Sequence, residues 1–219
     1  MKGVETVQVF HSSEWQAKRY VTAEQIKQAL DGFKLVGRRI KSMRLLGQSF
    51  YHTRYWVEST AYDILGDELP EEERQLQSEY ENISQDLPFF RFSQTDEPLM
   101  ILFEDGDHFE IEVPWESEFL MSMNAIPWEI KAERGLPNVD ANVLFLPCLE
   151  QKIVDVKIRP QSAIATEAAL EILLCLENDV KLCIGSMIDY TAITCLDEND
   201  NTLFLPFSEL RPALSNDEE

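Results

Sequence analysis

The densest group of side chains that could do chemistry is EDGDHFEIE at 104–112, which holds five carboxylates and one histidine. Such residues can bind a metal ion or transfer protons. The calcium-loop series D-x-[DN]-x-[DN]-G with a glutamate at its twelfth position is absent, however. His108, Glu110 and Glu112 alternate with three apolar residues, a period that is typical of a β-strand with one solvated face. We therefore expect a hairpin here, with no metal or cofactor.

The cysteines predict neither a metal centre nor a nucleophile. Their successive spacings are 27, 8 and 12, without a CxxC pair, and none of the three histidines is near them in sequence. A catalytic thiol would need a histidine partner. No G-x-S-x-G, P-loop, G-x-G-x-x-G or H-E-x-x-H sequence occurs either. We expect reduced structural thiols and no catalytic residue, which favours a function other than catalysis. The four cysteines are Cys148, Cys175, Cys183 and Cys195.

Acidic residues in the segment 60–97 are the strongest candidates for binding. This segment contains 11 acids against two arginines. A second segment, 124–142, carries a tryptophan between prolines, and loops added to a scaffold often bind partners. The alternative is that these segments cover an open edge or face of a sheet. The predicted partner-binding residues are Asp67, Glu68, Glu71, Glu72, Glu73 and Trp128.

The net charge narrows the class of partner. The chain has 40 acids and 19 bases, a formal charge of −21, and residues 60–219 hold 35 of the acids. Such a field repels phosphate backbones and anionic membranes, so we expect no nucleic-acid or membrane binding, and it attracts basic proteins. The alternative is that the acidity only maintains solubility. The N-terminus lacks the apolar core of a signal peptide, and no run of about 20 apolar residues occurs, which predicts a cytoplasmic protein.

A basic cluster near the N-terminus could in principle bind phosphate. Its members are Arg38, Arg39, Lys41 and Arg44, and they lie on a predicted strand within an acidic chain. Ion pairing within the protein, or a solvated face, is the favoured interpretation.

The elements that position these residues are predicted by an internal repeat. NVLFLP at 142–147 returns as NTLFLP at 201–206, an offset of 59 in the numbering. The segments 99–113 and 172–186 align at an offset of 73, and the segments 38–45 and 151–158 at an offset of 113. The three blocks keep the same order, which predicts a unit of about 60 residues duplicated in tandem, with insertions in the first copy only.

Within the repeat, apolar residues alternate with a period of two, which predicts strands. Turns around Gly106 and Asp179 must contain an odd number of residues to keep the apolar residues on one face. We also expect strands at 119–123 and 192–196, aligned with each other, and strands that end at the prolines of the two LFLP sequences. The opposing pairs predicted by this pattern are Phe103 with Phe109, Leu176 with Leu182, and Cys175 with Cys183.

Helices are expected outside the repeat. Thr22 and Gln25 form a capping box before an apolar stripe at helical spacing, and Pro70 begins a second helix that ends before Pro88. The predicted fold is α+β, mainly antiparallel β, with two four-stranded units packed as a sandwich or barrel. The predicted divisions are an N-terminal segment 1–36, a first repeat 37–149 with insertions near 54–96 and 126–139, a second repeat 150–210, and a disordered acidic tail 211–219.

These patterns predict a cytosolic, non-enzymatic protein that binds a basic partner protein. An immunity protein of the bacterial kind, which neutralises a basic toxin, is one concrete form of such a function. The alternative is a small-ligand binder, or a hydrolase that uses carboxylates, with its site between the two repeats. Two buried acids with raised pKa values in a pocket between the repeats would identify that alternative.

Overall fold

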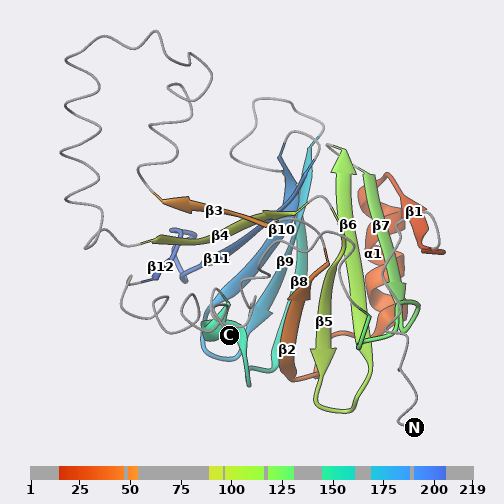
Figure 1. Cartoon of the computed structure of the whole chain (residues 1–219), viewed down its shortest axis with the longest axis horizontal. Helices are drawn as coiled ribbons and strands as arrows, with labels where there is room; N and C mark the ends of the chain where they lie inside the picture. The colour runs from red at the N-terminus through yellow and green to blue at the C-terminus, as the bar shows by residue number, and fades with distance from the viewer. Residues whose placement is uncertain are drawn as a thin grey trace, which may run out of the picture.

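The computed structural model describes residues 15–46, 49–53, 89–95, 97–115, 118–130, 145–160, 169–187 and 190–205. These residues form an α+β fold that is mainly antiparallel β, as predicted (Figure 1). The elements are β1 (Lys18–Tyr20), α1 (Ala23–Phe33), β2 (Ile40–Leu45), β3 (Ser49–Thr53), β4 (Phe89–Thr95), β5 (Leu99–Phe103), β6 (His108–Trp115), β7 (Glu118–Met123), the 3-10 helix η4 (Leu146–Cys148), β8 (Ile153–Pro160), β9 (Leu170–Leu176), β10 (Lys181–Met187), β11 (Tyr190–Leu196) and β12 (Phe204–Leu205).

The strands form two sheets. The five-stranded sheet has the order β1-β7-β6-β5-β2, and the seven-stranded sheet has the order β12-β4-β11-β10-β9-β8, with β3 paired to β4. Each sheet therefore contains four adjacent antiparallel strands in a meander-like order, although β3 and β4 come between β2 and β5 in the chain and lie in the other sheet. We call β2, β5, β6 and β7 the first meander, and β8, β9, β10 and β11 the second meander.

Helix α1 begins at the predicted capping box. The Thr22 hydroxyl accepts a hydrogen bond from the Gln25 N–H, and the Gln25 side chain accepts one from the Thr22 N–H. Ile26 and Leu30 lie on the buried face of the helix. The helix ends at Lys34, whose φ of 53° reverses the chain toward β2.

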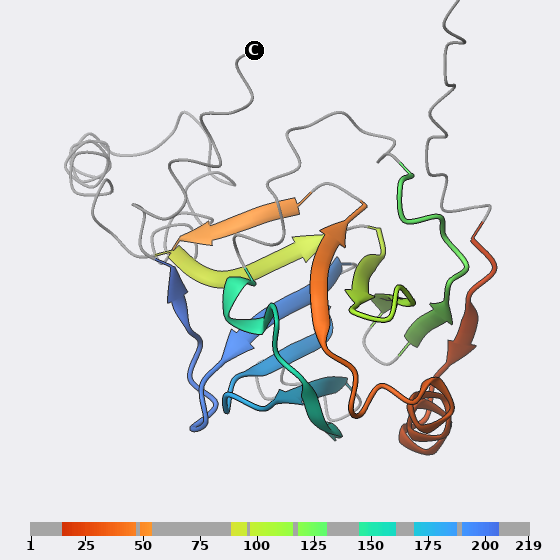
Figure 2. The same cartoon turned by 90° about the horizontal axis from the view of Figure 1, so that it is seen from below.

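One hydrophobic core joins both sheets and the helix. Its members include inward residues of both meanders together with residues of α1. A hydrogen bond of 2.8 Å from the Val113 N–H to the Thr191 hydroxyl also connects β6 to β11. Figure 2 shows α1 beside β1, and the helix also contacts β8. Burial of these apolar faces supplies most of the driving force for folding.

The two meanders share a β-bulge at the same position. In the β2–β5 pair the register shifts between Ile40 and Ser42, and in the β8–β9 pair it shifts between Ile153 and Asp155. The two bulges therefore occupy equivalent positions in the sequence segments 38–45 and 151–158, which the internal repeat aligns. A bulge bends and twists its strand, so both meanders curve at the same point.

The hairpins of the two meanders also have the same register, but the predicted register was wrong by two positions. Ile101, not Phe103, opposes Phe109, and Leu174, not Leu176, opposes Leu182. The turns still contain an odd number of residues, so the predicted apolar residues face the core. The residues at the third turn position have positive φ in both hairpins, 91° at Gly106 and 65° at Asp179.

The shifted register separates two cysteines that were predicted to face each other. Cys175 opposes Lys181, and Cys183 opposes Leu173. The structure instead places Cys148 and Cys195 in contact in the core, with 3.4 Å between their sulfur atoms. None of the four cysteines, all of which lie in the described residues, forms a disulfide.

The first strands of the two meanders pair with each other where they begin. The Gly37 N–H donates to the Ile153 carbonyl over 2.8 Å, and the Glu150 N–H donates to the Ile40 carbonyl over 2.7 Å. In the alignment of the repeat, Gly37 is equivalent to Glu150 and Ile40 to Ile153, and both Gly37 and Glu150 have positive φ. The two bonds thus have equivalent donors and equivalent acceptors in the two segments.

Two further predictions about strands were wrong in detail. Met123 occupies the position in β7 that Cys195 occupies in β11, one position away from the predicted alignment, because the β6–β7 pair contains an additional bulge. The first LFLP sequence does not form a strand where it is described, since Leu146–Cys148 is the 3-10 helix η4. In the second, Phe204–Leu205 pairs with β4.

The insertion predicted at 54–96 contributes a strand that the sequence did not indicate. β4 lies within it and pairs with β11 and β12, so this insertion extends the sheet of the second meander. The helix predicted at 70–87 and the tail 211–219 lie outside the described residues.

Candidate protein-interaction site

Three acidic turns lie at one end of the molecule. The turns 104–107, 177–180 and 197–201 hold three, two and three acids, and no base. The first two turns flank the point where β2 and β8 pair, since both contact Arg39. The third adjoins the second because Lys181 and Leu196, which border them, are paired. We call these three turns the acidic end.

Arginines of the basic cluster hold the first two turns in place. Arg38 forms ion pairs with Asp105 and Asp107 over 3.1 and 2.8 Å. Arg39 forms one with Glu177 over 2.6 Å. The predicted ion-pairing role of this cluster is therefore confirmed for both arginines. Although partial desolvation acts in the opposite direction, the hydrogen bond from Arg39 holds the pKa of Glu177 below its ordinary value.

Four carboxylates of the acidic end, those of Asp107, Glu177, Asp197 and Asp200, have pKa values below the ordinary value. Hydrogen bonds from Arg38 lower the pKa of Asp107, and hydrogen bonds from Lys181 lower the pKa of Asp200. The pKa of Asp197 is lowered by the side-chain amide and N–H of a residue in its own turn. These four carboxylates consequently keep their negative charge in mildly acidic solution, as a surface that attracts cationic groups requires.

Trp128 lies on the outer face of the first meander, away from the shared core. The segment 124–130 crosses that face and places Ile126 and Ile130 against Met100 in a second apolar cluster. The Arg44 guanidinium lies 5.5 Å from the centre of the Trp128 ring and donates hydrogen bonds to the carbonyls of Trp128 and Ile130. Trp128 is half-buried. This agrees with the alternative interpretation of the sequence, in which the segment covers a face of a sheet.

A buried carboxylate fixes the start of the same segment. Glu110 is fully buried and accepts hydrogen bonds from the Ser122 hydroxyl over 2.6 Å, and from the N–H groups of Ala125 and Ile126 over 2.9 and 3.2 Å. His108 is also buried, and its Nε2 donates to the Ile126 carbonyl. The expectation of a solvated face at these two positions was wrong, because the segment 124–130 covers them.

The remaining predicted partner-binding residues, Asp67, Glu68, Glu71, Glu72 and Glu73, lie outside the described residues. The structure therefore places Trp128 alone among the six. The acidic turns were not predicted as a binding surface, since the sequence indicated only hairpin turns around Gly106 and Asp179. The signal in the sequence was that three segments between the strands, 104–107, 177–180 and 197–201, are each rich in acids.

The described residues contain no group of three or more histidines, cysteines or acids that could hold a metal ion. A cavity of about 490 Å³ between the meanders is lined by Arg38, Arg39, Lys152 and two acids, Glu104 and Asp105, which are exposed. Burial raises the pKa values of Cys175 and Cys183, which keeps both thiols protonated at neutral pH.

Comparison with known proteins adds no functional assignment. The chain matches no protein-family model, and no curated protein or solved structure is significantly similar to it. Within the part of the chain that the structure describes, no helix is long and apolar enough to span a bilayer.

Proposed function

We propose that this protein is a non-enzymatic binding protein whose acidic end engages a basic partner protein. The observation that carries the proposal is the presence of three acidic turns on one side of the molecule, two of them fixed by Arg38 and Arg39. Charges on a rigid frame accelerate association and select partners of opposite sign. An immunity protein that neutralises a basic toxin is one form of this function, and the acids at 67–73 remain proposed partner-binding residues.

We further infer that the two meanders descend from one unit copied in tandem and packed through its apolar faces. Support comes from the bulges at Ile40 and Ile153, from the equal hairpin registers, and from the positive φ values at Gly106 and Asp179. A duplicated scaffold brings equivalent turns to the same end, which accounts for the position of the turns 104–107 and 177–180.

Affinity capture from cells of the native organism tests this function. The bait is the intact chain, at low and at high salt, beside a variant with Glu71, Glu72 and Glu73 replaced by lysine and another with Glu104 and Glu198 so replaced. We expect a basic protein that is retained at low salt and lost at high salt or with either variant. Capture that resists salt, or no specific capture at all, would remove the support for the proposal.

A further inference from the structure

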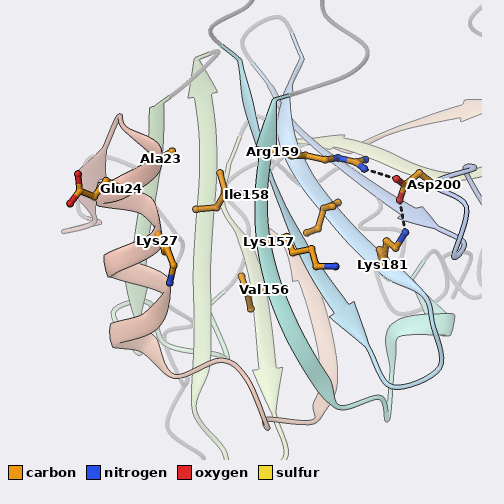
Figure 3. A pocket seen from close by; sticks show the side chains of 10 residues that line it. Ala23, Glu24, Lys27, Val156, Lys157, Ile158, Arg159, Lys181 and Asp200 are labelled. Atoms are coloured by element: carbon orange, nitrogen blue, oxygen red, sulfur yellow. Dashed lines mark hydrogen bonds and ion pairs between the residues drawn. The ribbon is translucent and has the colours of Figure 1, made fainter.

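A groove of about 680 Å³ runs from α1 across β8 onto the outer face of the second meander (Figure 3). Lys27 lies on its α1 side, and Lys157, Arg159 and Lys181 lie along β8 and β10. Leu173 contributes to its apolar lining and belongs to a small buried cluster on this face. The groove is thus an apolar surface bordered by cationic side chains in a chain of net charge −21.

The first meander shows how the equivalent surface binds a segment of the chain, which ends in a turn closed by a hydrogen bond from the Ile130 N–H to the Pro127 carbonyl over 3.1 Å. There the segment 124–130 is bound by donors to its carbonyls, Arg44 to Ile130 over 2.7 Å and His108 to Ile126 over 2.5 Å. Its apolar side chains pack on Met100 and Leu46. The segment, which contains a tryptophan and a glutamate, is therefore held by side chains that donate to its carbonyls and by apolar contacts with the sheet.

Four residues of the groove occupy, in the second meander, the positions of the residues that contact the segment 124–130 in the first meander. The register of the β2–β5 pair equals that of the β8–β9 pair, and the β5–β6 register equals that of β9–β10. Equivalent positions follow directly from these registers. Lys157 stands where the first meander has Arg44, Arg159 where it has Leu46, Leu173 where it has Met100, and Lys181 where it has His108.

The second meander carries no counterpart of the segment 124–130 among the described residues. β11 is followed by the turn 197–201, which leads directly to β12, whereas β7 is followed by the segment that covers the first meander. One end of the groove is occupied by Asp200, which bonds to Arg159 and Lys181 over 2.6 Å each. The rest is open.

Lys157 is the cation most available to a ligand. Its side chain is 59% exposed, and the nearest carboxylate, Asp155, is 3.7 Å away. The other three cations of the groove have closer acidic partners: Lys27 pairs with Asp31, Arg159 with Glu171 and Asp200, and Lys181 with Asp200. Lys157 is therefore the cation that can pair with an acidic side chain of a ligand, opposite in sign to the partner of the acidic end.

We propose that this groove binds an acidic segment of a partner protein that carries a large aromatic side chain. The aromatic ring packs beside Lys157 and Lys157 donates to main-chain carbonyls, as Trp128 and the carbonyls of its segment do with Arg44 in the first meander. As in the first meander, the bound segment is held through its carbonyls and a few side-chain anchors. It extends the proposed function, because the same chain then recognises acidic segments at one surface and basic ones at another.

A peptide copied from the protein itself provides the probe. A fluorophore-labelled peptide of residues 122–130, SMNAIPWEI, is titrated with the full chain and followed by fluorescence anisotropy. Two control peptides carry Trp128→Ala or Glu129→Lys. The protein variant K157E tests the groove, and K41E, which changes an exposed lysine on β2, is the matched control. Circular dichroism melting checks that both variants fold.

We expect the native peptide to bind the wild-type chain, and K157E or either peptide change to weaken binding by about tenfold or more. K41E is expected to bind as the wild type does. Saturable binding that K157E leaves unchanged would place the peptide elsewhere, for instance on the face of the first meander in place of its own segment, and would overturn the proposal. No binding up to millimolar protein would overturn it as well.

Discussion

Replacing Glu110 with alanine should destabilise the protein strongly. The carboxylate is fully buried and accepts hydrogen bonds from the Ser122 hydroxyl and from the N–H groups of Ala125 and Ile126. Alanine leaves three donors without an acceptor, at about 1–3 kcal/mol for each group that stays buried. Water entering the space left by the side chain offsets part of this loss. We expect the free energy of unfolding to fall by about 3–5 kcal/mol.

The assay is urea unfolding followed by far-ultraviolet circular dichroism and by tryptophan fluorescence. Glu110→Gln keeps the shape and one acceptor oxygen, so its loss should be smaller, about 1–2 kcal/mol. Glu104→Ala is the control, because that side chain lies on the same hairpin, is 74% exposed and has its ion-pair partner at 3.9 Å. Its effect should stay within about 0.5 kcal/mol.

Opening of the segment 124–130 alone would limit the global loss in Glu110→Ala, but it would expose Trp128 to water. The emission of the native variant would then shift to the red. A loss below about 1 kcal/mol together with an unchanged native emission spectrum would contradict the role of Glu110 in holding this segment.

Other perturbations test separate parts of the structure. Gly106→Ala should cost about 1 kcal/mol of stability in urea unfolding, because its φ of 91° strains a side chain; no loss would contradict the turn geometry. Thr22→Ala should also cost about 1 kcal/mol, measured in the same way, through loss of the capping box. The pKa of Asp107 is lowered in the folded state by Arg38, so its stabilisation is present above the unfolded pKa of about 4 and is lost as the pH falls through the folded value. In Asp107→Asn the urea midpoint should therefore fall less steeply than in the wild type as the pH drops below about 4. An unchanged slope would contradict the effect of Arg38 on the pKa of Asp107. In native protein a thiol-reactive dye should label Cys175 slowly and label the three buried cysteines only after unfolding, and rapid labelling of all four would refute their burial.

The apolar faces of the hairpins were predictable, whereas their registers were not. Alternation between Ile101, Phe103 and Phe109 fixes which residues share a face. It does not fix the length of the turn, because every turn with an odd number of residues preserves the same face. The prediction assumed a turn over 104–108, whereas the structure uses the shorter turn over 104–106. Gly106 is the last residue of that turn and has a positive φ. That choice displaced each predicted pair by two positions.

The candidate site was harder to predict because it depends on contacts between distant segments. His108 and Glu110 alternate with apolar residues like a solvated strand face, and the segment that covers them begins only after the whole of β7. Local periodicity cannot detect such a cover. Arg38 and Arg39 were predicted to form ion pairs, but which turns they hold follows only from the pairing of β2 with β8.

The central proposal is that the acidic end selects a basic partner. The most direct test measures the affinity of the captured partner for the wild type and for two double variants of equal charge, E104Q/E198Q at the acidic end and E24Q/E118Q near the opposite end. We predict that the first variant weakens binding by at least about threefold at low salt and that the second leaves it unchanged. Equal affinities for both variants, or a captured partner that is not basic, would contradict the proposal.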